Sequence, residues 1–364
     1  MKCSLIAIVG KPNSGKSTLL NQIMGQKISI VTPKVQTTRV NVRGVYNEND
    51  CQLIFTDTPG LFNPRDGHKL EEFIVNNALK AVKKVDDVIL LIDGTDQPDL
   101  EKYREILLKL TEARSNTKKS KKKYSKRQNE DNYSKNEELS DAHPSNNLYE
   151  MPLNDEVDDK QMRSTKVADP KCNDAPDLNG ESHGEDEHGT TYPSKFIIVI
   201  NKTDLSFDVA PWRDLATSLD LPYITISATK GTGVRELLHL LQTKAKDGPW
   251  LFSEDEYTSI TERELAEEIT REELYMQLRD ELPYSLKVDT DDWQELGEGE
   301  VKIYQSIVVL KDSQKNIVIG EQGSMIKKVG IGARRQLEEL LDRKVHLFLH
   351  VKVRDDWIDK LKLS

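Results

Sequence analysis

The stretch "GKPNSGKS", Gly10 to Ser17, constrains this chain more than any other. It matches G-x-x-x-x-G-K-[ST] and lies between "SLIAIVG", an apolar run typical of a buried strand, and "KSTLLNQIMG", a helical pattern that stops at Gly25. In this context glycines let the backbone wrap around phosphates, and the helix N-terminus attracts the anion. We expect Lys16 to neutralise the β- and γ-phosphates and the Ser17 hydroxyl to ligate Mg²⁺. The pattern predicts a P-loop nucleotide site; a glycine-rich turn without a ligand is the alternative.

Strand and helix patterns alternate on both sides of a long polar segment. "CQLIFTDTPG" and "DDVILLIDG" read as buried strands, and residues 69–82 and 100–113 as helices. The alternation resumes with the strand patterns "KFIIVINKTD" and "LPYITISATKG", and then with the amphipathic helix pattern "GVRELLHLLQTKA". We therefore predict an α/β, doubly wound P-loop sheet over residues 1–246. The apolar face of that last helix is expected to hold Val234, Leu237, Leu238 and Leu241.

Residues 115–194 interrupt this domain. They begin with a basic cluster, "KKSKKKYSKR", and continue with Asn, Ser, Asp, Glu and Pro. Such a composition buries too little apolar surface to offset the entropy of ordering, so we predict a disordered insertion. An arm whose lysines touch RNA or an acidic surface is the alternative.

Two further motifs complete a phosphate site. The first ends a strand pattern, and the second is expected to be a mobile segment, for which a β-branched loop entering a strand is the alternative. In "DTPG", Asp57 is expected to hold Mg²⁺ through water, and the Gly60 N–H to reach the γ-phosphate. In "IVTPKVQTTRV", either Thr37 or Thr38 should complete the Mg²⁺ shell, and we favour Thr38.

The motif "NKTD" predicts the choice of base. Asp204 can accept two hydrogen bonds from the N1–H and 2-amino group of guanine, which adenine lacks, so GTP is favoured over ATP. Lys202 is expected to pack along the base. In "SAT", backbone N–H groups of Ser227 and Ala228 can reach guanine O6.

The predicted roles form four sets. The catalytic residues are Lys16, Asp57, Gly60 and Thr38. The metal site comprises Ser17, Thr38 and Asp57 for Mg²⁺. Asn13 is expected to bind K⁺, because an asparagine at this place does so in related GTPases, and a loop-forming asparagine is the alternative. The GTP-binding residues are Gly10, Lys11, Pro12, Asn13, Ser14, Gly15, Lys16, Ser17, Thr18, Asp57, Thr58, Pro59, Gly60, Leu61, Asn201, Lys202, Thr203, Asp204, Ser227 and Ala228. The RNA-binding residues, which the C-terminal part supplies, are Ile319, Gly320, Glu321, Gln322, Gly323, Lys327, Lys328, Arg334 and Arg335.

Leu61 follows "DTPG" at a place where Ras-like switches use a glutamine to position the attacking water. Leucine cannot bind that water, but the phosphate cradle, Mg²⁺ and Lys16 supply much of the electrostatic catalysis. We predict a competent but slow GTPase whose water is placed by the backbone, by K⁺ or by an RNA-bound partner.

The last hundred residues form a second unit after a linker at 247–260. "TERELAEEITREELYMQLRDEL" is a helix pattern with a capping box, Thr261 and Glu264. "PYSLKVDTDDW", "VKIYQSIVVL", "NIVIG" and "KVHLFLHVKV" read as strands, and "SMIKKVGIGARRQLEELL" as a helix. The prediction is a small α+β domain over residues 261–364.

The loop "GEQG", Gly320 to Gly323, has the G-x-x-G form with which KH domains clamp a nucleic-acid backbone. It is expected between the "NIVIG" strand and a helix that carries Lys327, Lys328, Arg334 and Arg335. Those four cations could form a basic rim beside an apolar groove. A solvated helix face is the alternative.

Taken together, "GKPNSGKSTL", "QTTR", "DTPGL" and "NKTD", followed by "ELPYS", "VIGEQGSMIKKVGIGAR" and "KVHLFLHVKV", resemble the bacterial Era GTPase family over nearly all of the chain except residues 115–194. The resemblance implies a type II KH domain, α-β-β-α-α-β, behind the GTPase domain. It also implies a GTP-regulated chaperone of small-subunit ribosomal RNA that binds near the RNA's 3′ end and helps the small subunit mature, with peripheral contact to the inner membrane.

This sequence departs from the family in its long insertion and in the loop residues Glu321 and Gln322, where a basic residue is common. The negative charge of Glu321 is expected to weaken the grip on a phosphate.

Composition sets the remaining expectations. The 364 residues carry a net charge of −10, so the chain as a whole lacks a basic nucleic-acid footprint. The three cysteines have no disulfide or metal spacing, which fits a reducing compartment. No apolar run approaches a membrane span, and because a strand pattern begins at residue 3 we expect no signal or transit peptide. We expect a cytoplasmic monomer, with an organelle matrix as the alternative location.

Two other functions remain open at this point. One is a GTPase that acts on a protein or membrane target through its C-terminal module. The other is an RNA chaperone whose GTP site does not turn over.

Overall fold

The structure, a computed structural model, describes residues 1–32, 41–62, 69–114, 184–185, 191–192, 195–279 and 282–360. Residues Met1–Lys118 and His183–Ser364 belong to one compact unit. Within the predicted insertion, the short strands β5 (Gly184–Glu185) and β6 (Thr191–Tyr192) pair with each other in antiparallel fashion. The rest of that prediction lies outside the described residues.

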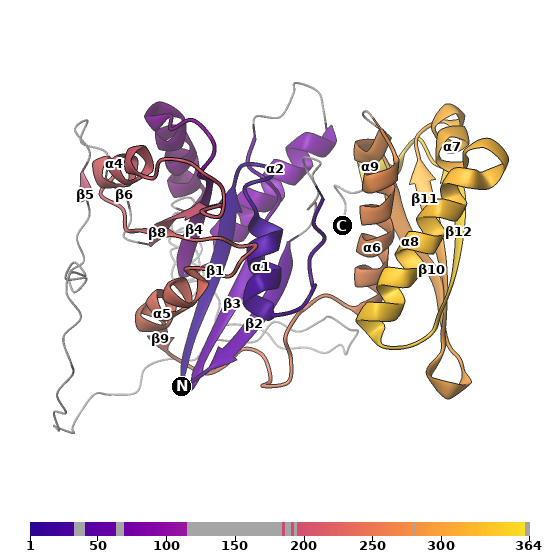
Figure 1. The fold of residues 1–364 in the computed structure, drawn as a ribbon, viewed down its shortest axis with the longest axis horizontal. Helices are drawn as coiled ribbons and strands as arrows, with labels where there is room; N and C mark the ends of the chain where they lie inside the picture. Colours follow the sequence, from indigo (N-terminus) through magenta and orange to yellow (C-terminus); the bar gives the residue numbers. More distant parts are fainter. Residues whose placement is uncertain are drawn as a thin grey trace, which may run out of the picture. The chain divides into compact units, whose positions relative to one another are not determined.

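The N-terminal part is built on a sheet whose strands follow the order β2-β3-β1-β4-β7-β8 (Figure 1). These strands are β1 (Lys2–Gly10), β2 (Val42–Glu48), β3 (Cys51–Asp57), β4 (Asp87–Asp93), β7 (Phe196–Asn201) and β8 (Tyr223–Thr225). All neighbours on this path are parallel except β2 with β3, and the short β9 (Lys246–Asp247) pairs antiparallel with β1. The carboxyl ends of β1, β3 and β7 therefore meet at one edge, where nucleotide ligands bind in such sheets.

Helices cover both faces of this sheet. They are α1 (Lys16–Met24), α2 (Lys69–Val82), a helix over residues 100–114, α4 (Ala210–Ser218) and α5 (Val234–Lys244). Along β1, Ile6 and Ile8 belong to an apolar cluster with residues of α1 and α5, whereas Ala7 and Val9 belong to a second cluster with Tyr103. This alternation confirms the doubly wound α/β architecture, because a strand presents successive side chains to opposite faces.

Strand β2 is an element that the sequence pattern does not predict. Its segment "VRGVYNE" lies at the edge of the sheet, and only Val42, Gly44 and Val45 are buried. An antiparallel edge strand needs no continuous apolar run, so its composition resembles that of a loop.

The predicted linker runs along the β2–β3 hairpin. The buried side chain of Gln52 accepts hydrogen bonds from the N–H groups of Leu251 and Phe252, and its amide donates to the Phe252 carbonyl. The Val45 N–H donates to the Tyr257 carbonyl at 2.9 Å. The bond from Val45 satisfies a backbone group of the edge strand β2 that would otherwise be open to pairing, and the bonds of Gln52 satisfy backbone groups of the linker.

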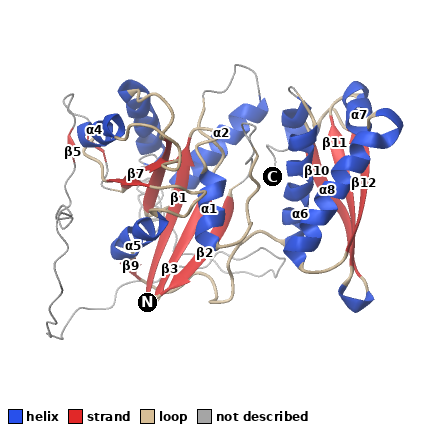
Figure 2. Ribbon diagram, in the orientation of Figure 1, coloured by secondary structure: helices blue, strands red, loops and turns tan. Residues whose placement is uncertain are grey.

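The C-terminal part combines helices with a sheet in the order β10-β11-β12 (Figure 2). Its elements are α6 (Glu262–Gln277), β10 (Lys287–Glu295), β11 (Val301–Val309), α7 (Asp312–Ile319), α8 (Ser324–Leu341) and β12 (Val345–Val353), followed by the short α9 (Trp357–Lys360). Both predicted bonds of the Thr261–Glu264 capping box are present. The element order confirms the α-β-β-α-α-β expectation.

The prediction of a strand at "NIVIG" is wrong, since these residues end helix α7. The pattern misled because three β-branched apolar residues in five match a strand template as well as a helix end. Val318 alone in α7 is buried, and the exposed fraction of Ile317 is 55%. The G-x-x-G loop therefore joins two helices rather than a strand and a helix. The first C-terminal strand also begins at Lys287, later than expected, because residues 282–285 form a 3₁₀ turn.

Among the helices that the structure describes, none combines the length and apolar character needed to cross a bilayer.

Candidate nucleotide site and RNA-binding loop

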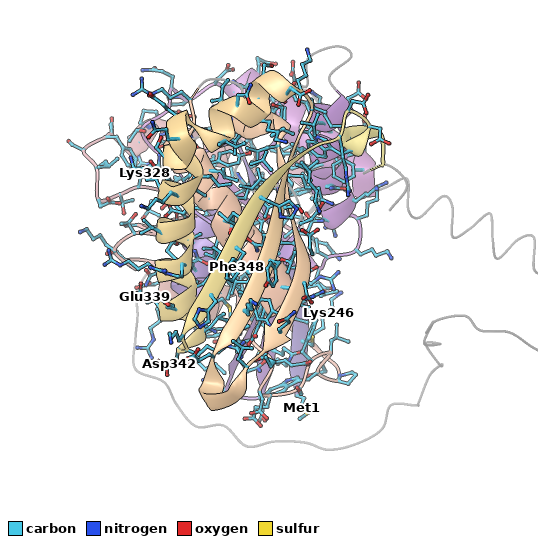
Figure 3. All side chains as sticks on the ribbon, turned by 90° about the vertical axis from the view of Figure 1, so that its right-hand side faces the viewer. Met1, Lys246, Lys328, Glu339, Asp342 and Phe348 are labelled. Atoms are coloured by element: carbon cyan, nitrogen blue, oxygen red, sulfur yellow. The ribbon has the colours of Figure 1, made fainter. Side chains whose placement is uncertain are left out.

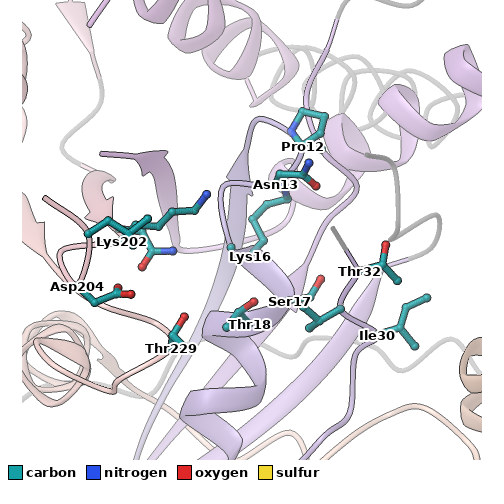
Figure 4. A pocket seen from close by; sticks show the side chains of 15 residues that line it. Pro12, Asn13, Lys16, Ser17, Thr18, Ile30, Thr32, Lys202, Asp204 and Thr229 are labelled. Atoms are coloured by element: carbon teal, nitrogen blue, oxygen red, sulfur yellow. The ribbon is translucent and has the colours of Figure 1, made fainter. Parts of the chain in front are cut away.

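A pocket of 540 Å³ lies at the carboxyl edge of the N-terminal sheet, over the start of α1 (Figure 4). It is lined by Pro12, Asn13, Gly15, Lys16, Ser17, Thr18, Ile30, Val31, Thr32, Gly60, Asn201, Lys202, Asp204, Leu205 and Thr229. Three motifs far apart in the sequence, "GKPNSGKS", "DTPG" and "NKTD", thus contribute to one cavity.

The P-loop has the backbone geometry that its glycines suggest. Gly15 has φ +95°, and a Cβ at this position would lie 2.3 Å from Asn201 Nδ2. Only glycine accommodates both the left-handed conformation and the close approach. The loop then enters α1, whose first residue is Lys16, so its N–H groups face the pocket.

Lys16 is almost completely buried, with an exposed fraction of 6%. Its Nζ donates hydrogen bonds to the carbonyl oxygens of Lys11 at 2.7 Å and Gly10 at 3.2 Å. Burial lowers the pKa of Lys16 to about 8, although the nearby Asp57 carboxylate raises it. The negative charge near this ammonium group therefore does not offset its burial, and the phosphates of a nucleotide would add the missing negative charge.

Asp57, the last residue of β3, is fully buried beside the P-loop. Its Oδ2 accepts hydrogen bonds from Ser17 Oγ at 2.6 Å and from Ser29 Oγ at 2.8 Å. Ser17 and Asp57 were expected to share a metal site, and the structure brings their oxygen atoms together.

Asn201 ties the base-binding motif to the P-loop. Its amide donates to the Ser14 carbonyl at 2.8 Å, and its Oδ1 accepts the Ala228 N–H at 2.9 Å. Asn201 is buried, so these bonds hold three loops at fixed positions. The N–H of Ala228, expected to reach guanine O6, is donated to Asn201 in this structure.

The acceptor predicted for guanine is exposed at the mouth of the pocket. Asp204 Oδ1 accepts a hydrogen bond from Ser227 Oγ at 2.5 Å, and this bond holds the pKa of Asp204 below its usual value. The group therefore remains a carboxylate, which is the form that accepts from guanine. Lys202 Nζ pairs with Asp93 Oδ2 at 2.5 Å, which leaves its aliphatic chain along the pocket wall.

Leu61 does not line the pocket. Its side chain packs against the apolar cluster that includes Val9 and Leu90, while its N–H donates to the Gly10 carbonyl at 2.9 Å. Gly60, by contrast, lines the pocket, and a Cβ there would lie 2.8 Å from Pro12. The structure thus gives the leucine a packing role.

The remaining predicted residues divide into three groups. Thr58 and Ser14 are buried behind the pocket, and Thr58 Oγ1 donates to the Ile8 carbonyl at 2.8 Å. Gly10, Lys11, Pro59 and Thr203 belong to the motif backbones but do not line the pocket. Thr37 and Thr38 lie outside the described residues.

Five lining residues, Ile30, Val31, Thr32, Leu205 and Thr229, were not predicted. Leu205 directly follows "NKTD", and Thr229 is the last residue of "SAT", of which only Ser227 and Ala228 were assigned a role. Ile30 to Thr32 begin the segment that contains Thr38, but nothing in their side chains indicates a site.

The same segment contacts the C-terminal helices. Glu272 of α6, with an exposed fraction of 5%, pairs with Lys27 and accepts the Val31 N–H at 2.9 Å. Lys27 Nζ also donates to Gln336 of α8 at 2.6 Å. Ile30 is buried among apolar residues of α6, β11 and α8.

The G-x-x-G loop forms a tight turn between α7 and α8. Gly320, Gln322 and Gly323 all have positive φ, and the Gly323 N–H donates to the Gly320 carbonyl at 3.1 Å. A Cβ on Gly320 would lie 2.7 Å from Met325 Cβ, so this position requires glycine. Glu321 is exposed at the tip.

The four cations predicted beside this loop, Lys327, Lys328, Arg334 and Arg335, are placed on α8, whose surface toward solvent also carries isoleucine. Ile317 of α7 and Ile331 of α8 are exposed by 55% and 51%. Ile331 lies three or four positions from each of the four cations along α8, so these side chains share one side of the helix. The basic rim beside an apolar groove stays a prediction. Figure 3 places Lys328 toward one end of α8 and Glu339 toward the other.

Comparisons with known proteins agree with both parts of the chain. A family described as "50S ribosome-binding GTPase" matches residues 5–125, and one described as "KH domain" matches residues 281–358. A protein named GTPase Era from Rickettsia bellii is 36% identical over 354 residues, which cover 97% of this chain and 93% of the relative. The chain belongs to the Era GTPase family. It is a GTPase, and the predicted family, fold class and enzyme class are confirmed.

Other Era proteins extend the comparison. GTPase Era from Brucella suis is 32% identical over 361 residues, 98% of this chain and 89% of the relative. A crystal structure of Era in complex with MgGDPNP and nucleotides 1506–1542 of 16S ribosomal RNA has a TM-score of 0.71 and 29% identity, and covers 100% of this chain and 97% of that one. A crystal structure of a single-residue variant of Aquifex aeolicus Era, bound to GDP and AlF₄⁻, has the same TM-score, identity and coverage.

Proposed function

We propose that this GTPase binds small-subunit ribosomal RNA under the control of GTP and acts in assembly of the small subunit and maturation of its RNA. The observation that carries the proposal is the solved Era complex with MgGDPNP and the 16S fragment, which matches this chain along its whole length. Two features of the chain support the proposal. The chain has a P-loop pocket within residues 1–246, and within residues 261–364 a glycine loop between two helices.

The pocket fits a magnesium nucleotide. Ser17 Oγ and the buried carboxylate of Asp57 are hard oxygen donors 2.6 Å apart, of the kind that Mg²⁺ prefers. A bound Mg²⁺ would neutralise charge on the β- and γ-phosphates. Lys16 would hold the same phosphates, and the Gly60 N–H would reach the γ-phosphate. Thr38 is the proposed further ligand.

We assign guanine recognition to Asp204, with Lys202 along the base and Ser227 and Ala228 near its O6. Asn13, which has φ +62° and lines the pocket, is the proposed ligand of K⁺. A K⁺ ion there would add a positive charge beside the phosphates and raise the slow hydrolysis rate. Comparing the rates in K⁺ and in Na⁺ tests this assignment.

We assign the RNA contact to Ile319–Gly323 and to the four α8 cations. Backbone N–H groups of a turn with positive φ can clamp phosphates, and α8 adds positive charge beside it. We further propose that the protein works as a monomer in the cytoplasm, with peripheral contact to the inner membrane.

The decisive experiment measures affinity for an RNA with the small-subunit 3′-end sequence in the presence of a GTP analogue and of GDP. We expect tighter binding with the GTP analogue and crosslinks at Gly320–Gly323. Equal and negligible affinity in both states would refute the proposal. Co-purification with a protein partner that survives nuclease treatment would then favour a protein target.

A further inference from the structure

Ser29 belongs to none of the nucleotide motifs, yet its side chain reaches the predicted magnesium site. It lies in "KISI", after α1, with an exposed fraction of only 2%. Its Oγ donates to Asp57 Oδ2 at 2.8 Å, the same oxygen that accepts Ser17 Oγ at 2.6 Å. Two hydroxyl groups from different segments therefore hold one carboxylate oxygen.

Asn21 of α1 fixes Ser29 in place. Its Oδ1 accepts the N–H groups of Ile28 and Ser29, each at 2.9 Å, and its Nδ2 donates to the Ser29 carbonyl at 2.7 Å. Three hydrogen bonds to two consecutive residues leave the backbone at Ser29 little freedom. The direction of the hydroxyl group is therefore built into the fold by a residue of the helix that follows the P-loop.

The two hydroxyl groups have different roles when a metal ion binds. Ser17 is the P-loop serine, whose oxygen ligates Mg²⁺. A Ser17 hydroxyl that binds the metal no longer holds Asp57 in a fixed orientation by its own hydrogen bond. Ser29 is not a P-loop residue, and its bond to Asp57 can persist. A buried carboxylate needs such a donor to keep its orientation.

We propose that Ser29 is a positioning residue of the magnesium site, whose hydroxyl holds the Asp57 carboxylate in the orientation that binds the metal's water, with Asn21 holding Ser29. This inference rests on the proposed binding of Mg²⁺. Partners of this kind, which orient a metal ligand, typically contribute about 10-fold to 100-fold to metal affinity.

The test uses the full chain loaded with a fluorescent GDP analogue. The rate of nucleotide release is followed over a series of free Mg²⁺ concentrations, which gives the midpoint for Mg²⁺. Ser29→Ala should raise this midpoint by about 10-fold or more, because Asp57 loses a donor that the metal does not claim. Release in excess EDTA should stay within about twofold, since no phosphate or base contact changes, and Ser29→Thr should restore much of the effect.

Ser4→Ala is the matched control. Ser4 is also a buried serine of the same sheet domain, but its hydroxyl group has no hydrogen-bond partner among the described residues. Its loss should leave the Mg²⁺ midpoint unchanged.

An unchanged midpoint for Ser29→Ala overturns the proposal. So does a lower midpoint, because Ser29 would then compete with the metal for Asp57. If Ser29→Ala fails to fold, Asn21→Ala keeps the hydroxyl and should still raise the midpoint; no rise overturns the proposal. If the unsubstituted protein shows no Mg²⁺ dependence at all, the proposed cofactor itself is wrong, and this result is distinct from a failure at Ser29.

Discussion

Burial lowers the pKa of the Lys16 ammonium group to about 8, well below the usual value for lysine. Between that value and about 10.4 the folded chain binds fewer protons than the unfolded chain, so this group makes the fold more stable as the pH rises through that window. Phosphates act in the opposite direction, because their negative charge raises the pKa of Lys16. We therefore expect nucleotide binding and protonation of Lys16 to be coupled.

We predict that GDP binding takes up a proton at about pH 8.5 and takes up almost none at about pH 6.5, since Lys16 is already protonated there. Above about pH 8 the affinity should fall by up to about tenfold per pH unit, because Lys16 must be protonated before it can hold the phosphates. Isothermal titration calorimetry in two buffers of different ionisation enthalpy measures the uptake directly. Heats that are independent of the buffer at the higher pH would contradict the prediction.

Leu61 shows how a residue can stand in a catalytic position of the sequence and still have a structural task. Its side chain packs on the apolar cluster between the sheet and the helices, away from the pocket lining. The position next to "DTPG" therefore supplies a backbone N–H and a packing contact. The attacking water must be placed by other groups.

Leu61→Ala should lower the free energy of unfolding by about 1 to 2 kcal/mol, less than for a fully buried leucine, and leave GTP hydrolysis within about twofold. Leu61→Gln should not raise the hydrolysis rate toward that of a stimulated switch. Chemical denaturation and single-turnover phosphate release measure the two effects. Leu79 packs on the same cluster as Leu61, so Leu79→Ala controls for the effect of lost stability alone on the hydrolysis rate. Fast GTP hydrolysis by Leu61→Gln without a partner would mean that Leu61 itself keeps the hydrolysis rate low.

At the scale of elements, the turn between α7 and α8 combines a fixed backbone with an unfavourable charge. The positive φ angles of Gly320, Gln322 and Gly323 fix the direction of the backbone in this turn. The exposed Glu321 places a carboxylate where a phosphate is expected. The cations of α8 lie on the helix that follows. The net attraction for RNA thus depends on opposing charges within a few residues.

Glu321→Lys should strengthen RNA binding and make its salt dependence steeper by about 0.7 in the log–log slope, the value for one added contact to single-stranded RNA. Fluorescence anisotropy over a series of salt concentrations measures both quantities. Glu339→Lys makes the same charge change toward the other end of α8. If both variants gain equally, the effect comes from net charge and not from the loop.

At the scale of the whole molecule, Lys27 and Val31, which precede the predicted Mg²⁺ ligand Thr38, contact the C-terminal helices α6 and α8. Glu272 is buried and takes hydrogen bonds from Lys27 and from the Val31 N–H, and Gln336 of α8 takes another from Lys27. Such a connection lets a change near the nucleotide alter α8, the helix that follows the G-x-x-G loop, provided that the contact differs between the two states.

Lys27→Ala should therefore reduce the ratio of RNA affinities measured with GTP analogue and with GDP, while GDP affinity stays within about twofold, because Lys27 does not line the pocket. Lys246→Ala, an exposed lysine on β9, is the control. The RNA affinities of both variants, measured with the GTP analogue and with GDP, test this prediction. An unchanged ratio would show that this contact does not couple the sites.

Sequence patterns predicted most of the nucleotide site because each motif follows a strong apolar strand. Parallel strands bring their carboxyl ends together whatever lies between them in the chain. The patterns failed where the apolar residues of an element do not recur with the period typical of that element. Strand β2 is a mixed edge strand, and the end of α7 carries β-branched residues in a helix.

The sequence alone determined the fold class and the P-loop with its serine and lysine, since both depend on local spacing and periodicity, and the resemblance to a known family supplied the KH order. Only the tertiary structure decided that Leu61 packs in the core, that Lys16 is buried enough to lower its pKa, and that Ser29 shares Asp57 with Ser17. Burial, and contacts between residues 28 positions apart such as Ser29 and Asp57, depend on which segments the fold places together. The periodic pattern of a single sequence does not show which distant segments the fold brings together.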